Sequence, residues 1–253
     1  MGLFGQKSEI NGVRYSVGKK DAKVIKSPNA AGNISILAEV EGKPVTGIEN
    51  GAFKKCKDLT GVVIPEGVKV ISEISLTSGE SGAFSGCINL VDVTIPASVY
   101  LIGDNAFEKC ASLKEIVIPG IADTIGDYAF LNCENLESVT LAVHIRRIGD
   151  HAFSGCKKLG SMALPEGARM IGESAFSGCA QLRSITIPAS VTQIDTFYDD
   201  INALAPRGAL SGALSFAFTG CSPELTIIGQ AGSSAEKYAK KQRINFTVAV
   251  AAS

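Results

Sequence analysis

The sequence predicts a solenoid, a right-handed stack of 23-residue units built from short strands and short helical or turn segments. Three observations predict it: the pair Ala-Phe recurs along the chain, a cysteine stands three residues after each of these phenylalanines, and apolar residues then alternate up to a proline. The middle four units, residues 83–174, follow one another without a gap. Chance does not keep so many columns in register, so the repeat defines the fold.

Each unit opens at Ala-Phe, at residues 52, 83, 106, 129, 152, 175 and 217. One unit cannot bury its apolar side alone, so equivalent residues of stacked units are expected to form continuous core columns. The phenylalanine column is Phe53, Phe84, Phe107, Phe130, Phe153, Phe176 and Phe218. The cysteine column contains every cysteine of the chain: Cys56, Cys87, Cys110, Cys133, Cys156, Cys179 and Cys221.

The strand of each unit follows a leucine, as in the segment from Leu182 to Pro188, where apolar and polar residues alternate. Such alternation predicts a half-buried strand, and the proline ends it because proline cannot donate to a ladder. A second apolar pair then leads to Ile-Gly, as at Ile125 and Gly126. We expect this glycine to form a tight turn with a positive φ.

The ends of the chain depart from the repeat and predict caps. Residues 1–9 are expected to be a flexible N-terminus or tag, and residues 10–51 a β-rich cap with strand-like segments at 13–17 and 34–40. The repeats occupy residues 52–224. Residues 225–253 predict a strand–helix–strand cap, in which Ser233 and Glu236 form a capping box for a helix over 235–243.

Two units carry insertions, near residues 73–82 and 195–216. Both enter after the isoleucine of Ile-Gly, and in both the glycine is replaced, by Ser72 and Asp195. The turn is therefore rebuilt where a loop leaves the stack. Long loops are often functional, so Phe197, Tyr198 and Asp199 are candidate contact residues, although they equally fit a degenerate helix.

Composition excludes several classes of partner. The net charge is -1, which gives no overall attraction to nucleic acid, and no stretch approaches 18 apolar residues, so no membrane span is expected. We expect a monomer. The first nine residues lack the apolar core of a secretory signal, which leaves an intracellular chain or a mature or trimmed one.

No residue pattern predicts catalysis, a metal site or a cofactor. The cysteines lack the paired spacing of metal ligands, and side chains of one column point the same way, which disfavours disulfides. We therefore expect free, buried thiols. The two histidines, His144 and His151, stand apart from any special cysteine, and no nucleotide-binding, hydrolase or zinc-protease motif occurs.

The text of residues 175–194, Ala-Phe-Ser-Gly-Cys-x-x-Leu-x-x-Ile-Thr-Ile-Pro-x-x-Val-x-x-Ile, resembles the BspA-type leucine-rich repeats of bacterial surface proteins and some parasitic protists. The segment 232–239 looks like the C-terminal cap of that family, and the resemblance covers about residues 10–250. It implies a leucine-rich-repeat solenoid, adhesion to host proteins or other cells, and a cell-surface or secreted location. The chain departs from better-known leucine-rich repeats in lacking an asparagine column after the strand.

The variable columns before Ile-Gly supply the candidate binding residues within the regular array. They form a possible aromatic and cationic ridge, composed of residue types enriched at interfaces: Tyr100, Leu101, Arg146, Arg147, Arg169 and Met170. An ordinary solvated face is the alternative. Three functions follow in decreasing order: a non-catalytic module that binds a protein or glycoprotein, a structural spacer, and a glycan-active enzyme that uses carboxylates on a rigid strand face.

Overall fold

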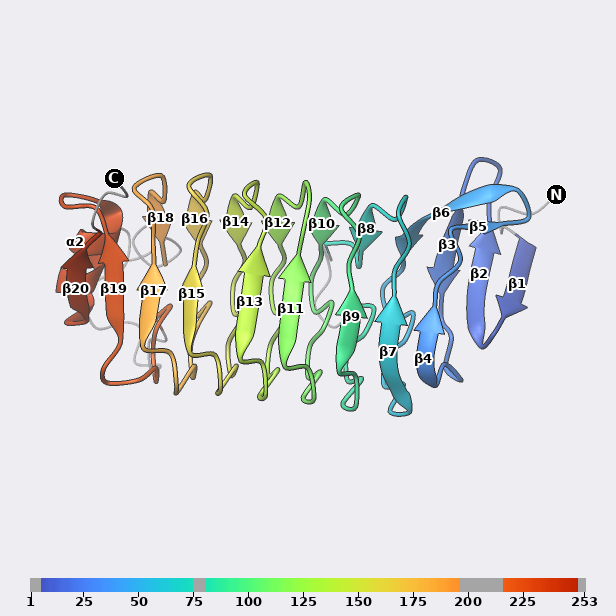
Figure 1. Ribbon diagram of the computed structural model, residues 1–253, viewed down its shortest axis with the longest axis horizontal. Coiled ribbons are helices and arrows are strands. Elements are labelled where there is room, and N and C mark those ends of the chain that lie inside the picture. Colours follow the sequence, from blue (N-terminus) through green and yellow to red (C-terminus); the bar gives the residue numbers. More distant parts are fainter. Residues whose placement is uncertain (1–5, 75–80, 196–215, 250–253) are drawn as a thin grey trace, which may run out of the picture.

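The computed structural model describes residues 6–74, 81–195 and 216–249 as an elongated stack, with the N-terminal strands at one end and the C-terminal helix and last strand at the other (Figure 1). Strands line two sides of the stack, and each regular unit gives one strand to each side. The longer strands are drawn across the front of Figure 1, and the short strands along its upper part. The predicted solenoid is confirmed, with mostly parallel strands and few helices.

The longer strands pair in parallel within three separate sheets, β4-β7-β9, β11-β13 and β15-β17-β19-β20. Their bounds are Gly32–Ser35 (β4), Leu59–Val63 (β7), Asp92–Thr94 (β9), Glu115–Ile118 (β11), Ser138–Leu141 (β13), Ser161–Ala163 (β15), Ser184–Thr186 (β17), Thr226–Gly229 (β19) and Asn245–Val248 (β20). Their apolar residues point inward, as in β11, where Ile116 and Ile118 are buried and Glu115 and Val117 are exposed.

The other side is one sheet that runs from the N-terminal cap through all the regular units. It begins with β1 (Gln6–Ile10), β2 (Val13–Val17), β3 (Ala22–Ile25) and β6 (Lys43–Ile48), and β5 (Glu39–Val40) pairs with β6. Two-residue strands then follow in parallel register: β8 (Val70–Ile71), β10 (Leu101–Ile102), β12 (Thr124–Ile125), β14 (Arg147–Ile148), β16 (Met170–Ile171) and β18 (Gln193–Ile194). The isoleucine of each short strand is buried, and the residue before it faces outward.

The phenylalanine column runs through the core as a continuous stack of rings. Consecutive ring centroids lie 5.0 to 5.5 Å apart, and consecutive rings are tilted by at most 11°. All seven side chains are buried. At the C-terminal end Tyr238 meets Phe218 edge-on, with 5.9 Å between the ring centroids, and so covers the last ring.

The cysteine column has a hydrogen-bonding role as well as a packing role. The Cys110 thiol donates to the Phe84 carbonyl oxygen of the preceding unit (3.3 Å), and the Cys133 thiol donates to the Phe107 carbonyl oxygen (3.1 Å). Six cysteines are buried, whereas Cys221, expected in the core, is half-buried because its unit borders the C-terminal cap. Burial raises the pKa of the Cys133 thiol to about 12.

The glycine of Ile-Gly is needed for a reason other than the one the sequence suggested. The expected positive φ lies two residues later, at Tyr128 (φ 58°) rather than at Gly126. At Gly126 a β-carbon would lie 2.6 Å from the carbonyl carbon of Gly103 in the preceding unit. The glycine therefore permits close approach of stacked backbones, and the expectation of a left-handed glycine is wrong.

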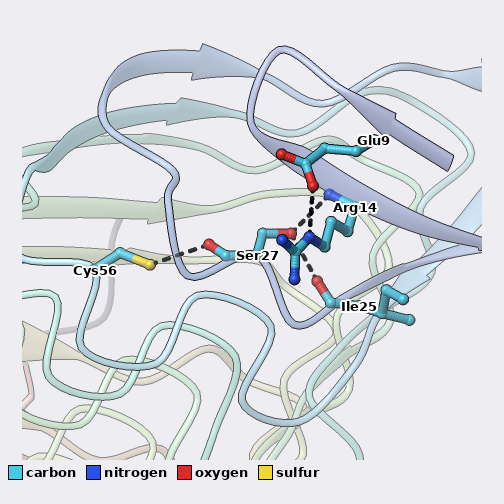
Figure 2. A network of polar contacts seen from close by, with 5 residues as sticks. All are labelled: Glu9, Arg14, Ile25, Ser27 and Cys56. Atoms are coloured by element: carbon cyan, nitrogen blue, oxygen red, sulfur yellow. Dashed lines mark hydrogen bonds and ion pairs between the residues drawn. The ribbon is translucent and has the colours of Figure 1, made fainter. Parts of the chain in front are cut away.

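The N-terminal cap contains a degenerate unit in which Ser27 takes the place of the phenylalanine (Figure 2). Its N–H donates to the Ala52 carbonyl oxygen (2.6 Å), and its carbonyl oxygen accepts the Cys56 thiol (3.3 Å). Its hydroxyl accepts the Arg14 N–H (2.8 Å) and donates to the Ile25 carbonyl oxygen (2.7 Å). Every polar group of this fully buried serine is thus satisfied. The Ser27 carbonyl oxygen also gives Cys56, the first cysteine of the column, the acceptor that a phenylalanine carbonyl provides in later units.

The structure also corrects the expectation for residues 1–9, of which it describes 6–9. These residues belong to β1, which pairs antiparallel with β2. The hairpin turn at Asn11 and Gly12 has a positive φ at both residues, which suits a two-residue turn. An ion pair joins the two strands of the hairpin, with the Arg14 Nε 2.6 Å from the Glu9 carboxylate (Figure 2).

Both insertions leave the stack through the same local device. In a regular unit the N–H of the opening alanine bonds to the glycine carbonyl, as Ala106 does to Gly103 (3.4 Å). In the first irregular unit the Ala83 N–H donates instead to the Ser72 hydroxyl (2.6 Å). In the second the Ala217 N–H donates to the Asp195 carboxylate (2.7 Å). A polar side chain therefore replaces the backbone bond that the insertion removes.

The C-terminal cap has the expected strand–helix–strand order, with α2 spanning Ser234–Gln242 between β19 and β20. The Ser233 hydroxyl accepts the Glu236 N–H (3.3 Å), while the Glu236 carboxylate accepts the Gly232 N–H (2.6 Å). The helix ends at Arg243, which is left-handed (φ 58°). This cap closes the stack because Tyr238 on α2 covers the phenylalanine column.

Candidate binding face

The residues that precede each Ile-Gly position form one outward surface on β8 to β18, here named the short-strand face. It comprises residues 69–70, 100–101, 123–124, 146–147, 169–170 and 192–193. The strands are in register, with Leu101 beside Thr124, Thr124 beside Arg147, and Arg147 beside Met170. Neighbouring strands of a sheet lie about 4.8 Å apart, so the face is a regular array.

The structure places all six ridge residues on this face, but it divides them into two groups. The first residue of each pair is exposed: Tyr100, Arg146 and Arg169. The second residue of each pair is half-buried: Leu101, Arg147 and Met170. The first group is therefore the more accessible to solvent.

The ridge is interrupted by a carboxylate. Asp123 immediately precedes β12, between the segments that carry Tyr100 and Arg146, and its Oδ1 is 3.4 Å from the Arg146 Nε. Arg147 donates to the Asp127 carboxylate (2.6 Å), and the same carboxylate oxygen accepts the Asp150 N–H (2.8 Å). Arg147 therefore supports the turn, whereas Arg169 forms no ion pair with another residue of the described part of the chain. The three insertion candidates, Phe197, Tyr198 and Asp199, lie outside the described residues.

A column of acidic residues borders the face, and the sequence reasoning did not use it. The Asp104 side chain accepts the Asp127 N–H (2.8 Å), and the Asp150 side chain accepts the Glu173 N–H (2.8 Å). The signal was visible as Ile-Gly-Asp at a 23-residue spacing. Next to this column the rings of Tyr128 and His151 stack with centroids 4.8 Å apart. These aspartates join consecutive turns, so their first role is structural.

A cavity of about 330 Å³ opens at the N-terminal end of the short-strand face. Residues of β3, β6 and β8 and of the segments beside them line it, including Lys23, Thr46, Lys69 and Tyr100, the residue before β10. Tyr100 therefore belongs both to the ridge and to the cavity wall. No sequence signal marked the cavity, because its lining combines the irregular cap with the first repeats.

The described residues include no cluster of three histidine, cysteine or acidic side chains that could hold a metal ion. Burial also raises the pKa of the Cys87 thiol to about 12, so this thiol is not an activated nucleophile. No helix in the described part of the chain has the length and apolar character needed to cross a membrane, and α2 has only 9 residues.

The comparisons with known proteins agree with this architecture. The model of the BspA-type leucine-rich repeat region matches six copies, over residues 33–80 and 77–202. A leucine-rich repeat protein of T. pallidum is 24% identical over 82% of this chain and 100% of its own, with a TM-score of 0.64. A leucine-rich repeat protein from Bacteroides ovatus is 24% identical over 96% of this chain and 67% of its own, with a TM-score of 0.51. No curated protein matches the sequence.

The repeated units and the regular face define a repeat module of the class that serves protein interaction or scaffolding. The family match covers more than half of the chain. The chain therefore belongs to the BspA-type leucine-rich repeat family.

Proposed function

We propose that this chain is a non-catalytic protein-binding module and that the short-strand face is its contact surface. The observation that carries the proposal is the parallel register of β10, β12, β14 and β16, which sets the residues directly before these strands, among them Tyr100, Arg146 and Arg169, on one face. A pre-ordered surface loses little side-chain and backbone freedom on binding, which favours affinity. Arginine and tyrosine are enriched at the centres of interfaces.

The exposed ridge favours a partner with acidic groups beside an apolar surface. Arg169 has no carboxylate partner among the described residues, and the Arg146–Asp123 contact is solvent-exposed, so both guanidinium groups remain available. Exposed ion pairs contribute about 0 to 1 kcal/mol, so a partner carboxylate displaces Asp123 at little cost. Met170, which follows Arg169, and Leu101, which follows Tyr100, supply apolar surface on the same face.

Membership of the BspA-type family supports adhesion at the cell surface, or secretion, as the setting of this interaction. Proteolysis of intact cells tests this location: the chain is digested if it is exposed, while a cytoplasmic marker survives. Protection equal to that of the marker contradicts a surface location.

A binding experiment with matched variants tests the contact surface. Immobilised wild-type protein is exposed to extracellular-matrix proteins, host-cell surface proteins and proteins of co-resident bacteria, and saturable binding is measured. The triple variant Y100A/R146A/R169A is expected to lose at least about tenfold in affinity, since truncating an interface hot spot costs about 2 kcal/mol or more. The control is T94A/T140A/T186A on the longer strands, which is expected to bind as wild type.

Two results contradict the proposal. The first is the absence of a saturable partner for the folded protein, which favours a spacer instead. The second is a saturable partner whose affinity is unchanged in the triple variant, which places the contact on another surface.

A further inference from the structure

The cavity at the N-terminal end of the short-strand face has the chemistry of a small-molecule site. Its volume of about 330 Å³ is at the lower end of the range for ligand-binding clefts. It lies where the cap strands β3 and β6 meet the first short strands β8 and β10. A regular repeat has no equivalent, because the cap supplies one wall.

Part of its polar lining is held in place by internal contacts. The Lys23 ammonium group lies 3.3 Å from the Glu73 carboxylate, and the Thr46 hydroxyl donates to the Asp21 carboxylate (2.7 Å). These pairs fix groups from different turns around the cavity. A preformed lining reduces the ordering cost of binding.

The remaining polar groups are uncommitted. The side chains of Glu49 and Lys69 line the cavity and make no hydrogen bond or ion pair with any other residue in the described ranges. Lys69 offers three N–H donors, and Glu49 offers carboxylate acceptors. Both side chains are exposed, so a ligand reaches them without a conformational change.

The charge balance gives no strong attraction to an anion or to a cation. Three carboxylates, Asp21, Glu49 and Glu73, face two ammonium groups, Lys23 and Lys69, which gives a formal charge of -1. An anionic ligand meets the excess of carboxylates, and a cationic ligand meets two lysines. A neutral polyhydroxyl ligand donates to the carboxylates and accepts from the lysines at once.

The aromatic wall completes the pattern. Tyr100 is 45% exposed and lines the cavity, so its ring is accessible to an apolar surface of a ligand. The C–H groups on one face of a pyranose ring fit an electron-rich aromatic face, while the hydroxyl groups point outward to polar partners. We propose that this cavity binds one neutral sugar unit, a hexose or an N-acetylhexosamine. This site goes beyond the protein contact proposed above and does not depend on it.

Amide-detected NMR titration of the whole chain with methyl glycosides tests the site. The probes are the methyl glycosides of glucose, galactose, mannose and N-acetylglucosamine, with inorganic phosphate and glycylglycine as ionic probes. At least one glycoside is expected to shift the amide signals of Gly47, Val70 and Tyr100. The expected Kd is on the order of 1 mM, as for a ligand of about a dozen non-hydrogen atoms with ordinary efficiency.

Variants locate the binding. Y100A and K69A change exposed side chains, and each is expected to lower the affinity for the glycoside by at least about tenfold. Y128A removes a second exposed tyrosine outside the cavity and is expected to bind as wild type. Unchanged signals elsewhere in the spectrum show that each variant is folded.

Three results overturn the inference. One is no shift of the cavity amides by any glycoside at about ten times the expected Kd. Another is glycoside binding that is unchanged in both Y100A and K69A. The third is tighter binding of phosphate or glycylglycine than of every glycoside, which makes the cavity an ion site.

Discussion

Asp195 joins the second insertion to the C-terminal cap, and its removal is expected to loosen that end of the stack. The carboxylate is 5% exposed, accepts the Ala217 N–H (2.7 Å) and accepts the Tyr238 hydroxyl. D195A leaves two buried donors without an acceptor, at about 1–3 kcal/mol each. Relief of the cost of burying a carboxyl group offsets part of this loss, so we expect a net loss of about 2–4 kcal/mol.

Native-state hydrogen exchange is the suitable assay because a solenoid opens locally from its ends. D195A is expected to lower the protection of α2 and β19 and to leave β11 unchanged. D195N keeps an oxygen acceptor for both donors and is expected to lose about 1 kcal/mol or less. Equal losses in D195N and D195A, or a loss below about 0.5 kcal/mol in D195A, refute the proposed role of the carboxylate.

The same residue gives a pH dependence with a defined sign. Burial raises the pKa of the Asp195 carboxyl, and the hydrogen bonds from Ala217 and Tyr238 only partly oppose this. A raised folded-state pKa favours the protonated group in the folded protein. Its contribution to stability is complete below the unfolded pKa and is lost as pH rises through the folded pKa. The stability of wild type relative to D195N is therefore expected to increase as pH falls from 7 through that range.

Three further changes test the core. F130A removes a buried ring that stacks on both sides, with centroid distances of 5.3 and 5.2 Å. It is expected to lower the free energy of unfolding, measured in urea, by about 3–5 kcal/mol. A loss below about 1 kcal/mol contradicts a continuous core column. G126A places a β-carbon 2.6 Å from the Gly103 backbone and is expected to lower the denaturation midpoint, whereas G160A, with no atom within 4 Å of its β-carbon, leaves it nearly unchanged. Equal midpoints contradict the close approach. Thiol titration is expected to find seven free thiols that react on unfolding, with Cys221 the first to react in the folded protein because it alone is half-buried; a disulfide contradicts this.

The regular part of the fold was predictable because each position recurs at a fixed spacing. A phenylalanine or cysteine at the same place in the internal units has equivalent neighbours in each, so a prediction made for one unit holds for the others. The ridge residues were placed on one face for the same reason. The repeat pattern alone did not separate the two columns, whereas the structure exposes the first residue before the buried isoleucine and half-buries the second, as Tyr100 and Leu101 show.

The irregular parts were hidden because their interactions do not recur. Ser27 fills a phenylalanine position through backbone bonds that leave no hydrophobic signal. Ser72 and Asp195 were visible as substitutions for glycine, but their bonds to the next unit depend on left-handed backbone geometry, with φ of 60° and 55°. The cavity beside Tyr100 combines residues from 21 to 100 and so has no local pattern.

Hydrogen exchange of the complex with a saturable partner tests the contact surface most directly. We expect protection on binding at residues 100–101, 146–147 and 169–170, and no change at residues 115–118 and 138–141 on the longer strands. Protection confined to the longer strands, with the short-strand face exchanging as in the free protein, contradicts the short-strand face as the contact surface.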